Sequence, residues 1–444
     1  MHAEEIALDV SISIVSARLY LRTVELFQDI FMNICIQCKF VKNFREKDNI
    51  MKKMIFLFSK DAMSIENLPL YGNKYWKTPN IDALAQKGTV FYNHHTSAAS
   101  TSMVFSSMLT GKYPHEFTNR KRYVHVPVNE HRSIFDELQE QGYDCHIIWS
   151  SDYMTGAWPY VREFGDETKT KIHVVEMHQT AGLHREEGKE LVRSDKVAEE
   201  TCQKVIEELE SISKTEKQFI WLHLPHVLKG RISYGDDIDL TDMLLGFVRQ
   251  RYGDENIYFT ADHGHMNFHK NIMAYGFHVY ELTCRVPLII PRINGLTRVD
   301  ELTSHIDLKT LLLENRIVKR NFVFVDTQYY TQPYRKLAVI SNQFKYIYNK
   351  KENTEELYDL KWDPEERFNL LEIDRYDDDK NLVRNTRELY FYPYWGDVER
   401  AYEMLKAEKD KIWRIGTPLE EFLCKLRALI TKAKKRHIAR RIMR

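Results

Sequence analysis

Between residues 54 and 261, short apolar runs alternate with longer segments whose apolar positions have helical spacing. The runs MIFLFS, CHIIWSS, FIWLHL and NIYFTA are typical of strands that are buried on both faces. The helical segments include IDALAQKG, SMVFSSMLTG and SIFDELQEQGY, and each ends at or next to a glycine, a common helix stop. Strands that alternate with helices predict an α/β fold, with a largely parallel sheet covered on both faces.

The pattern changes after about residue 320. The runs NFVFVDTQYY, RKLAVISN and FKYIYN are strand-like and separated by turns, and helical spacing returns only near the end. We therefore predict four parts in chain order: an N-terminal helical extension (1–50), a catalytic α/β domain (51–320), a small C-terminal antiparallel subdomain of the same fold (321–375) and a helical, basic tail (376–444).

Charge is balanced over the chain as a whole but not at its end. There are 64 Lys and Arg against 64 Asp and Glu, so no overall field indicates a nucleic-acid partner. Residues 425–444 hold nine Lys and Arg and no acidic residue. A solvated helix explains this segment, and so does peripheral contact with an anionic membrane surface or a polyanionic substrate.

Cysteine usage and the first residues of the sequence predict a cytoplasmic protein. The six cysteines are scattered apart from Cys35 and Cys38, and a lone CxxC is weak evidence for zinc or redox chemistry, so we interpret both as packing residues. No signal-peptide pattern opens the sequence, and no run of about 18 apolar residues occurs in it. We therefore expect no transmembrane helix.

Three loops that follow predicted strands carry polar residues suited to chemistry. Asp61 follows MIFLFS, Asp262 and His263 follow NIYFTA, and a stretch rich in serine and threonine leads up to Thr101. The carboxyl ends of parallel strands meet at one edge of a sheet, where sites form. Carboxylate and imidazole ligands suit a divalent cation. Taken singly, each of these residues also fits a helix cap or an ordinary turn.

Seven segments, in order, resemble the sulfatase branch of the alkaline-phosphatase-like superfamily over about residues 54–372. They are IFLFSKD, YGNKYWKTPNIDALAQKGTVFYN, SSMLTGKYP, FTADHGH, YELTCRVPLIIP, SHIDLKTLLLE and FKYIYNKKENTEELYDLKWDPEERFNLLE. The resemblance implies a three-layer α/β/α sandwich with a mostly parallel central sheet and a small C-terminal antiparallel subdomain. It also implies a metal-dependent hydrolase or phosphotransferase.

The nucleophile of this family falls on Thr101 when positions are counted back from LTGKYP. Sulfatases carry a C/S-x-P-x-R motif there, whose first residue is oxidised to formylglycine, whereas this window reads TSMVF and lacks the cysteine, the proline and the arginine. The window is similar instead to phosphoethanolamine transferases and lipoteichoic-acid-type synthases, which use an unmodified threonine. The resemblance then implies a metal set of Asp61, Thr101, Asp262 and His263, holding Zn, Mn, Ca or Mg.

The residues around Thr101 favour this role. A threonine hydroxyl is a weak nucleophile unless a metal activates it. Thr101 precedes SMVFSSML, so we expect it at a helix N-terminus, where backbone N–H groups favour a bound phosphoryl group. A plain N-cap is the alternative interpretation of Thr101, and Ser100 and Ser102 are the fallback nucleophiles.

Further site residues follow from the same resemblance. His226 and His278 are predicted to contact the reacting group, and a histidine at 278 could protonate the leaving oxygen. Ser102, Lys112 and His226 are predicted to bind substrate. The predicted reaction is ping-pong transfer of a phosphoryl group through Thr101, from a glycan or phospholipid-type substrate to water or an acceptor hydroxyl. Two alternatives stay open: a sulfatase that does not use formylglycine, and a non-catalytic polyanion-binding homologue.

Overall fold

The structure of the chain is a computed structural model. It describes residues 53–117, 132–150, 170–175, 194–225, 234–267, 269–272, 275–327, 335–377, 382–385 and 388–412. The predicted N-terminal extension (1–50) and the basic segment 425–444 lie outside the described residues.

A mostly parallel sheet forms the centre of the described chain. Its strand order is β5-β4-β6-β1-β7-β8-β2-β9. The first five strands run parallel to one another: β5 (Thr170–Val175), β4 (Asp144–Ser150), β6 (Gln218–Leu224), β1 (Met54–Lys60) and β7 (Ile257–Ala261). The remaining three are β8 (Leu288–Ile290), antiparallel to β7 and to β2 (Thr89–Phe91), and β9 (Arg298–Val299), parallel to β2. The predicted sheet is confirmed.

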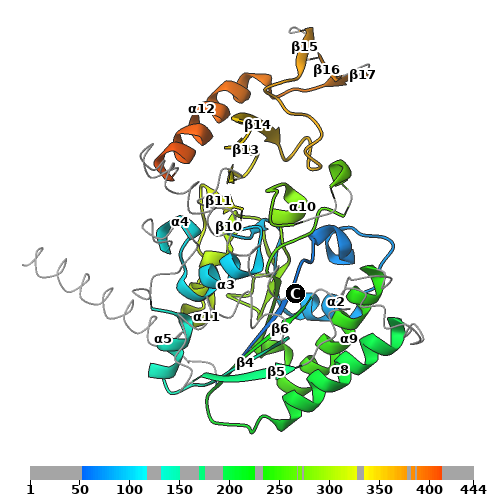
Figure 1. Cartoon of the computed structure of the whole chain (residues 1–444), viewed down its shortest axis with the longest axis vertical. Helices are drawn as coiled ribbons and strands as arrows, with labels where there is room; N and C mark the ends of the chain where they lie inside the picture. The colour runs from blue at the N-terminus through cyan, green and yellow to red at the C-terminus, as the bar shows by residue number, and fades with distance from the viewer. Residues whose placement is uncertain are drawn as a thin grey trace, which may run out of the picture. The chain divides into compact units, whose positions relative to one another are not determined.

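Helices cover both faces of this sheet, which confirms the predicted three layers (Figure 1). One face carries α2 (Pro79–Lys87), α8 (Ser194–Ser211) and α9 (Tyr234–Tyr252). The other carries α3 (Thr101–Thr110), α5 (Ile134–Glu140) and α11 (Leu308–Glu314). Local signals start these helices: Pro79 is the first residue of α2, and a capping box joins Ser133 to Asp136 at the start of α5.

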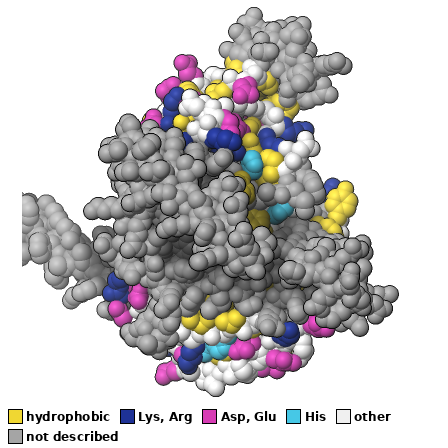
Figure 2. All heavy atoms as spheres, viewed as in Figure 1, with side chains coloured by type: hydrophobic (Ala, Val, Ile, Leu, Met, Phe, Trp, Pro, Cys, Tyr) yellow, Lys and Arg dark blue, Asp and Glu magenta, His cyan; other side chains and the backbone are white. Residues whose placement is uncertain are grey.

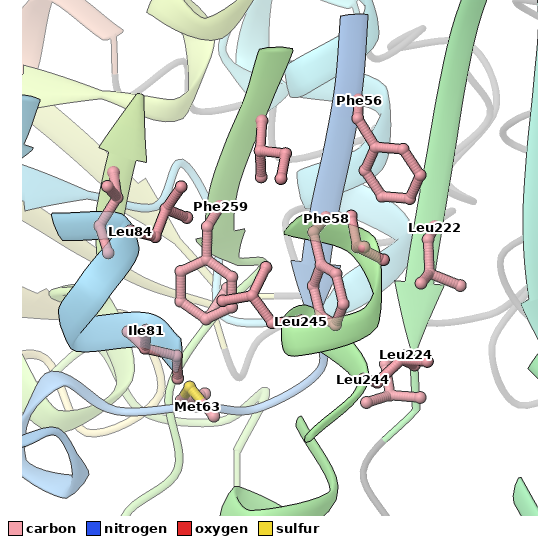
Figure 3. Packing of buried hydrophobic residues seen from close by; sticks show 14 of the residues in the cluster. Phe56, Phe58, Met63, Ile81, Leu84, Leu222, Leu224, Leu244, Leu245 and Phe259 are labelled. Atoms are coloured by element: carbon pink, nitrogen blue, oxygen red, sulfur yellow. The ribbon is translucent and has the colours of Figure 1, made fainter. Parts of the chain in front are cut away.

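Residues of β1 alternate between the two faces, as the two-residue period of a strand requires. The even residues Phe56 and Phe58 pack with Leu222 of β6 and Phe259 of β7 against the helices of the first face (Figure 3). Lys60 continues this row and is fully buried, with its ammonium group 2.9 Å from Asp237 of α9. The same ammonium donates hydrogen bonds to the backbone oxygens of Asp61 and Pro225. This buried pair therefore fixes the strand end from which Asp61 emerges.

Aromatic rings fill the opposite face of the sheet. Phe105 of α3 packs edge-on against Trp221 and His223 of β6, with ring centroids 4.8 and 4.6 Å apart. Ser59 of β1 accepts a hydrogen bond from Trp221 Nε1 and donates one to His223 Nδ1, both 2.8 Å long. The helix that begins at Thr101 is thus packed directly onto β6, next to the end of β1.

A second, antiparallel sheet follows the central one in the chain, as predicted. Its strands are β11 (Val323–Asp326), β12 (Lys336–Ile340), β13 (Phe344–Asn349) and β14 (Thr354–Asp359), in that order. Helix α12 (Trp395–Ile412) packs on it through Val398, Ala401 and Leu405. Four further short elements are the paired strands β3 (His94–His95) and β10 (Thr303–Ser304) and the one-turn helices α4 (Pro114–Phe117) and α10 (Glu281–Cys284).

The chain after residue 375 differs from the predicted helical tail. Three short antiparallel strands, β15 (Asp374–Asp377), β16 (Leu382–Asn385) and β17 (Glu388–Phe391), precede α12. Only two residues separate β16 from β17, a spacing that favours a hairpin over a helix. The helical prediction is correct only from Trp395 onward within the described residues.

Helices of up to 19 residues occur in the part of the chain that the structure describes. Within that part, no helix combines the length and the apolar character that crossing a membrane requires. On the face shown in Figure 2, acidic and basic side chains are interspersed.

Candidate active site

The ends of β1 and β7 bring Asp61, Asp262 and His263 together. Lys60 and Ala261 are paired in register, so the next residues of the two strands leave the sheet side by side. His263 Nε2 lies 3.6 Å from an oxygen of Asp61 and 3.6 Å from an oxygen of Asp262. One ligand atom from each residue lies within 4.8 Å of the others, and all three side chains are buried. This is the geometry of a cation site built from two carboxylates and an imidazole.

Hydrogen bonding fixes the orientation of the His263 imidazole. Its Nδ1 donates to the backbone oxygen of Gly264 at 2.9 Å. The lone pair of the neutral ring therefore sits on Nε2, which faces the two carboxylates. A histidine that donates through one nitrogen and presents the other is prepared to bind a metal.

Gly264 is required by the close approach of another loop. A Cβ atom at this position would lie 1.8 Å from the backbone oxygen of Leu282, which no side chain tolerates. The Gly264 N–H donates to Thr283 O at 2.9 Å, and the Ser64 hydroxyl binds the backbone of His265 and Leu282. The glycine of the Asp-His-Gly motif thus locks the metal-ligand loop against α10.

Burial and the like charge of Asp61 both raise the pKa of Asp262. Its Oδ1 accepts hydrogen bonds from the N–H groups of Ala62 (3.1 Å) and His263 (2.7 Å). Burial raises the pKa of Asp262 to about 6, and although His263 opposes the rise, Asp61 adds to it. Two buried acids beside a histidine lone pair form a donor set that fits a divalent cation. The predicted ligands Asp61, Asp262 and His263 therefore meet at one point.

Thr101 completes this cluster from a third element. It is the first residue of α3, and its Oγ1 lies 3.3 Å from His263 Nε2. The N-cap is Ser100, so the alternative interpretation of Thr101 as the cap is wrong. The Ser100 hydroxyl makes no capping hydrogen bond, and it is buried without a partner among the described residues. The N-terminus of α3 is therefore left uncapped by side chains, facing the cluster.

Strand β10, helix α10 and the antiparallel sheet hold the loop that carries Thr101. His94 and His95 pair with β10, and Thr96 N donates to Cys284 O of α10. Ala99 N donates to Asp326 O of β11, and Asp326 N donates to Ser97 O. All residues from His94 to Ser100 are buried. Thr101 is thus placed by backbone contacts with the small sheet as well as by its own helix.

Comparison with known proteins finds relatives of this fold. Residues 52–227 match the Sulfatase family. The phosphonate monoester hydrolase of Agrobacterium radiobacter has a similar structure, with a TM-score of 0.55, 15% identity and coverage of 80% of this chain and 96% of that one. Residues 52–227 are thus similar to sulfatases, and the fold of the chain is like that of the phosphonate monoester hydrolase.

Two proteins that act on sulfated sugars have structures that are similar to this chain to the same degree. A 2-O GAG sulfatase gives a TM-score of 0.56 at 15% identity, covering 81% of this chain and 93% of its own. A protein solved in complex with its substrate D-glucosamine-2-N,6-O-disulfate gives 0.58 at 15% identity, covering 81% and 98%. At these identities the likeness is one of fold.

The other predicted site residues of the sulfatase-like domain are placed less favourably. His226 lies outside the described residues. The His278 ring lies against Tyr280, its Nδ1 is 3.1 Å from Lys336 Nζ, and burial together with Lys336 lowers its pKa to about 4. Among the described residues its contacts are thus with β12 and Tyr280, and none joins it to Thr101 or His263.

Ser102 and Lys112 lie at opposite ends of α3. Ser102 is the second residue of the helix and is partly exposed beside Thr101. Lys112 follows the helix end at Gly111, and ten residues of helix span about 15 Å. Lys112 therefore lies at the end of α3 remote from Thr101, and its role in binding substrate stays a prediction.

Tyr275 is a site residue that the sequence did not reveal. Its ring stacks on the His263 imidazole, with centroids 4.6 Å apart and an angle of 29° between the planes. Asp61, then burial, then Asp262 raise its pKa far above the usual range. Nothing in its sequence context, AYGFH, distinguishes it from an ordinary loop tyrosine.

Proposed function

We propose that this protein is a metal-dependent phosphoester hydrolase or phosphotransferase that works through a covalent intermediate on Thr101. The observation that carries the proposal is the position of the Thr101 hydroxyl, 3.3 Å from His263 Nε2 and at the uncapped start of α3. A plain helix-capping threonine has no reason to adjoin two buried carboxylates and an oriented imidazole. The intact cluster also argues against a non-catalytic homologue.

The proposed reaction has two steps that balance in bonds and protons. Thr101 Oγ1 attacks phosphorus, an O–P bond to the leaving alcohol breaks, and the hydroxyl proton of Thr101 ends on that alcohol. Water, or an acceptor hydroxyl, then attacks the same phosphorus, the Thr101 O–P bond breaks, and the incoming proton restores the threonine hydroxyl.

Different groups of the site would bind the cation, bind the phosphoryl group and position Thr101. Asp61, Asp262 and His263 would hold a divalent cation, whose charge favours loss of a proton from a nearby hydroxyl and stabilises phosphoryl oxygens. The backbone N–H groups at the start of α3 point toward the same region and favour a bound anion through the helix dipole. The loop from His94 to Ser100 keeps Thr101 fixed relative to the three ligands.

The substrate class is proposed from two kinds of support. The absence of cysteine, proline and arginine from the window TSMVF speaks against formylglycine and so for phosphorus over sulfur. The similar structures include a phosphonate monoester hydrolase, a 2-O GAG sulfatase and a protein whose substrate is a disulfated glucosamine. We therefore propose a phosphorylated glycan or lipid-linked saccharide as the substrate.

Turnover of matched aryl esters tests the proposal. Protein loaded with Mn²⁺ or Zn²⁺ is assayed with a phosphate diester, a phosphate monoester and a sulfate ester. Thr101→Ala should lose at least about a thousandfold in kcat, the scale of a missing nucleophile, whereas Thr101→Ser should keep part of the activity. Thr110→Ala is the matched control, since Thr110 ends the same helix and only donates to Ser106 O.

Three outcomes would contradict the proposal in different ways. Phosphoester turnover that survives in Thr101→Ala but not in Ser102→Ala would move the nucleophile to Ser102. Turnover of the sulfate ester alone would restore the sulfatase alternative. Wild-type protein that binds no metal and turns over no ester would favour the non-catalytic alternative.

A further inference from the structure

We infer that Tyr275 belongs to the reaction centre, where its ring fixes the His263 imidazole and its hydroxyl donates a hydrogen bond to the phosphoryl group being transferred. The inference rests on the proposed function, and it assigns the contact to a residue that the sequence motifs do not include. Three features of the structure support it: the stacking of the ring, its partial exposure, and the engagement of His278 elsewhere.

The ring of Tyr275 covers one flat side of His263. The centroids are 4.6 Å apart and the planes differ by 29°, close to a parallel stack. His263 is fully buried, its Nδ1 donates to Gly264 O, and the ring of Tyr275 supports the imidazole from one side. Nε2 is in the plane of the ring that Tyr275 supports, and this is the atom that faces Thr101, Asp61 and Asp262.

Tyr275 is partly open to solvent, unlike the residues beneath it. It is 38% exposed, whereas Asp61, Asp262 and His263 are 4% exposed or less. A substrate that reaches the cluster from solvent therefore meets Tyr275 on the way in. The chain turns immediately after it, because Gly276 has a φ of 81°, a conformation that glycine adopts freely.

The carboxylates of the cluster also act on the phenol of Tyr275, whose ring lies against their neighbour His263. Asp61, then burial, then Asp262 raise its pKa above the usual range. The inference places this hydroxyl against an oxygen of a phosphoryl group bound at the cluster. A neutral phenol is a donor that is compatible with an anionic partner.

His278, the residue first predicted for this contact, is occupied elsewhere. Its Nδ1 is 3.1 Å from Lys336 Nζ, and its ring lies against Tyr280. Within the described part of the loop between Gly264 and Glu281, Tyr275 is stacked on the metal-ligating histidine while His278 is directed to the second sheet. The contact with the reacting group that was predicted for His278 is therefore assigned to Tyr275.

Two substitutions separate the ring from the hydroxyl. Tyr275→Phe keeps the stack and removes the O–H group, whereas Tyr275→Leu removes both. Tyr394→Phe is the control, because Tyr394 has a similar exposure of 45% and contacts Tyr392 near α12. For each protein, calorimetry measures the affinity for Mn²⁺ and then the affinity of the Mn²⁺-loaded protein for inorganic phosphate. Turnover of the aryl phosphate diester gives kcat and KM separately.

Tyr275→Phe should bind Mn²⁺ within about twofold of the wild type, bind phosphate about tenfold more weakly and lose about tenfold or more in kcat/KM, the effect of one lost hydrogen bond to a charged group. Tyr275→Leu should in addition bind Mn²⁺ several-fold more weakly. Unchanged phosphate affinity and turnover in Tyr275→Phe would overturn the inference while leaving the proposed function intact. Wild-type protein that binds Mn²⁺ but neither binds phosphate nor turns over an ester would overturn both.

Discussion

Burying two carboxylates next to each other is unfavourable, since each disfavours the charge of the other and both lose contact with water. Asp61 and Asp262 are in this situation at the ends of β1 and β7. The pKa of Asp262 rises to about 6 for this reason, mainly through burial. A divalent cation would offset this repulsion, so metal binding should raise the free energy of unfolding.

Metal affinity should therefore depend on pH through Asp262. A raised pKa means that the acid is protonated below about pH 6, and a protonated acid must lose its proton before it can bind a cation. The affinity for Mn²⁺ should be nearly constant above pH 7 and fall by up to about tenfold per pH unit below 6. Calorimetry at pH 7.5, 6.5 and 5.5 measures this, with proton release checked in a second buffer.

Two aspartate substitutions control the pH experiment. Asp262→Asn should abolish Mn²⁺ binding, whereas Asp300→Asn should leave it unchanged, because Asp300 forms only an exposed pair with Arg298. Affinity that does not vary between pH 7.5 and 5.5 would show that the pKa of Asp262 is not raised in the metal-free protein.

Asp61, Asp262 and His263 could be predicted because they lie at strand ends, whose positions the apolar runs define, whereas Thr101 is located by its spacing from LTGKYP. Asp61 follows the run of β1, and Asp262 and His263 follow the run of β7, so the register of a parallel sheet alone brings them together. Lys112, His278 and Tyr275 could not be placed in this way. Their positions depend on the length of α3 and on the path of the loop before α10, and neither leaves a periodic pattern in the sequence.

A buried charge network joins the second sheet to the elements that hold the active-site loops. Lys345 of β13 is fully buried, with Nζ 3.0 Å from Glu281 of α10 and 2.9 Å from Glu366. Glu281 N donates to Glu366, and His95 of β3 lies 3.2 Å from Glu281. Since α10 also locks Gly264 and Thr96, the small sheet supports both the metal-ligand loop and the Thr101 loop.

Removing the ammonium group of Lys345 from this network should destabilise the whole protein. Lys345→Met leaves two buried acids without a counter-charge, and breaking a buried pair costs about 3–5 kcal/mol in the free energy of unfolding. Lys351→Met is the control, because its pair with Glu352 is exposed, and it should change stability by less than about 0.5 kcal/mol. Urea unfolding of both variants measures the difference. Equal midpoints would mean that the network carries no net stability.

Across the molecule, several histidines are buried in the neutral form. His305 Nε2 donates to the backbone oxygen of Ala261, the residue before Asp262, and His305 Nδ1 accepts from His94 Nε2 at 2.8 Å. His223 of β6 lies between Ser59 of β1, with which it shares a hydrogen bond, and the ring of Phe105 of α3. Burial lowers the pKa of His305 to about 4 and that of His223 to about 3. These rings therefore support the site as hydrogen-bonding groups, not as charges.

Neutral buried histidines make the fold sensitive to acid. The folded pKa of His223, about 3, is below the unfolded value of 6.5, so its contribution is fully present above pH 6.5 and is lost as pH falls through the window from 6.5 to about 3. The raised pKa values of Asp262 and Glu366 act in the opposite direction, so the total pH dependence does not isolate one ring. The difference in unfolding free energy between wild type and His223→Gln isolates this ring, since the two proteins differ only in the titration of His223. That difference in unfolding free energy, measured with urea, should favour the wild type at pH 7.5 and shrink by up to about 1.4 kcal/mol per pH unit below 6. A difference that stays constant down to pH 5 would mean that His223 is protonated in the folded protein.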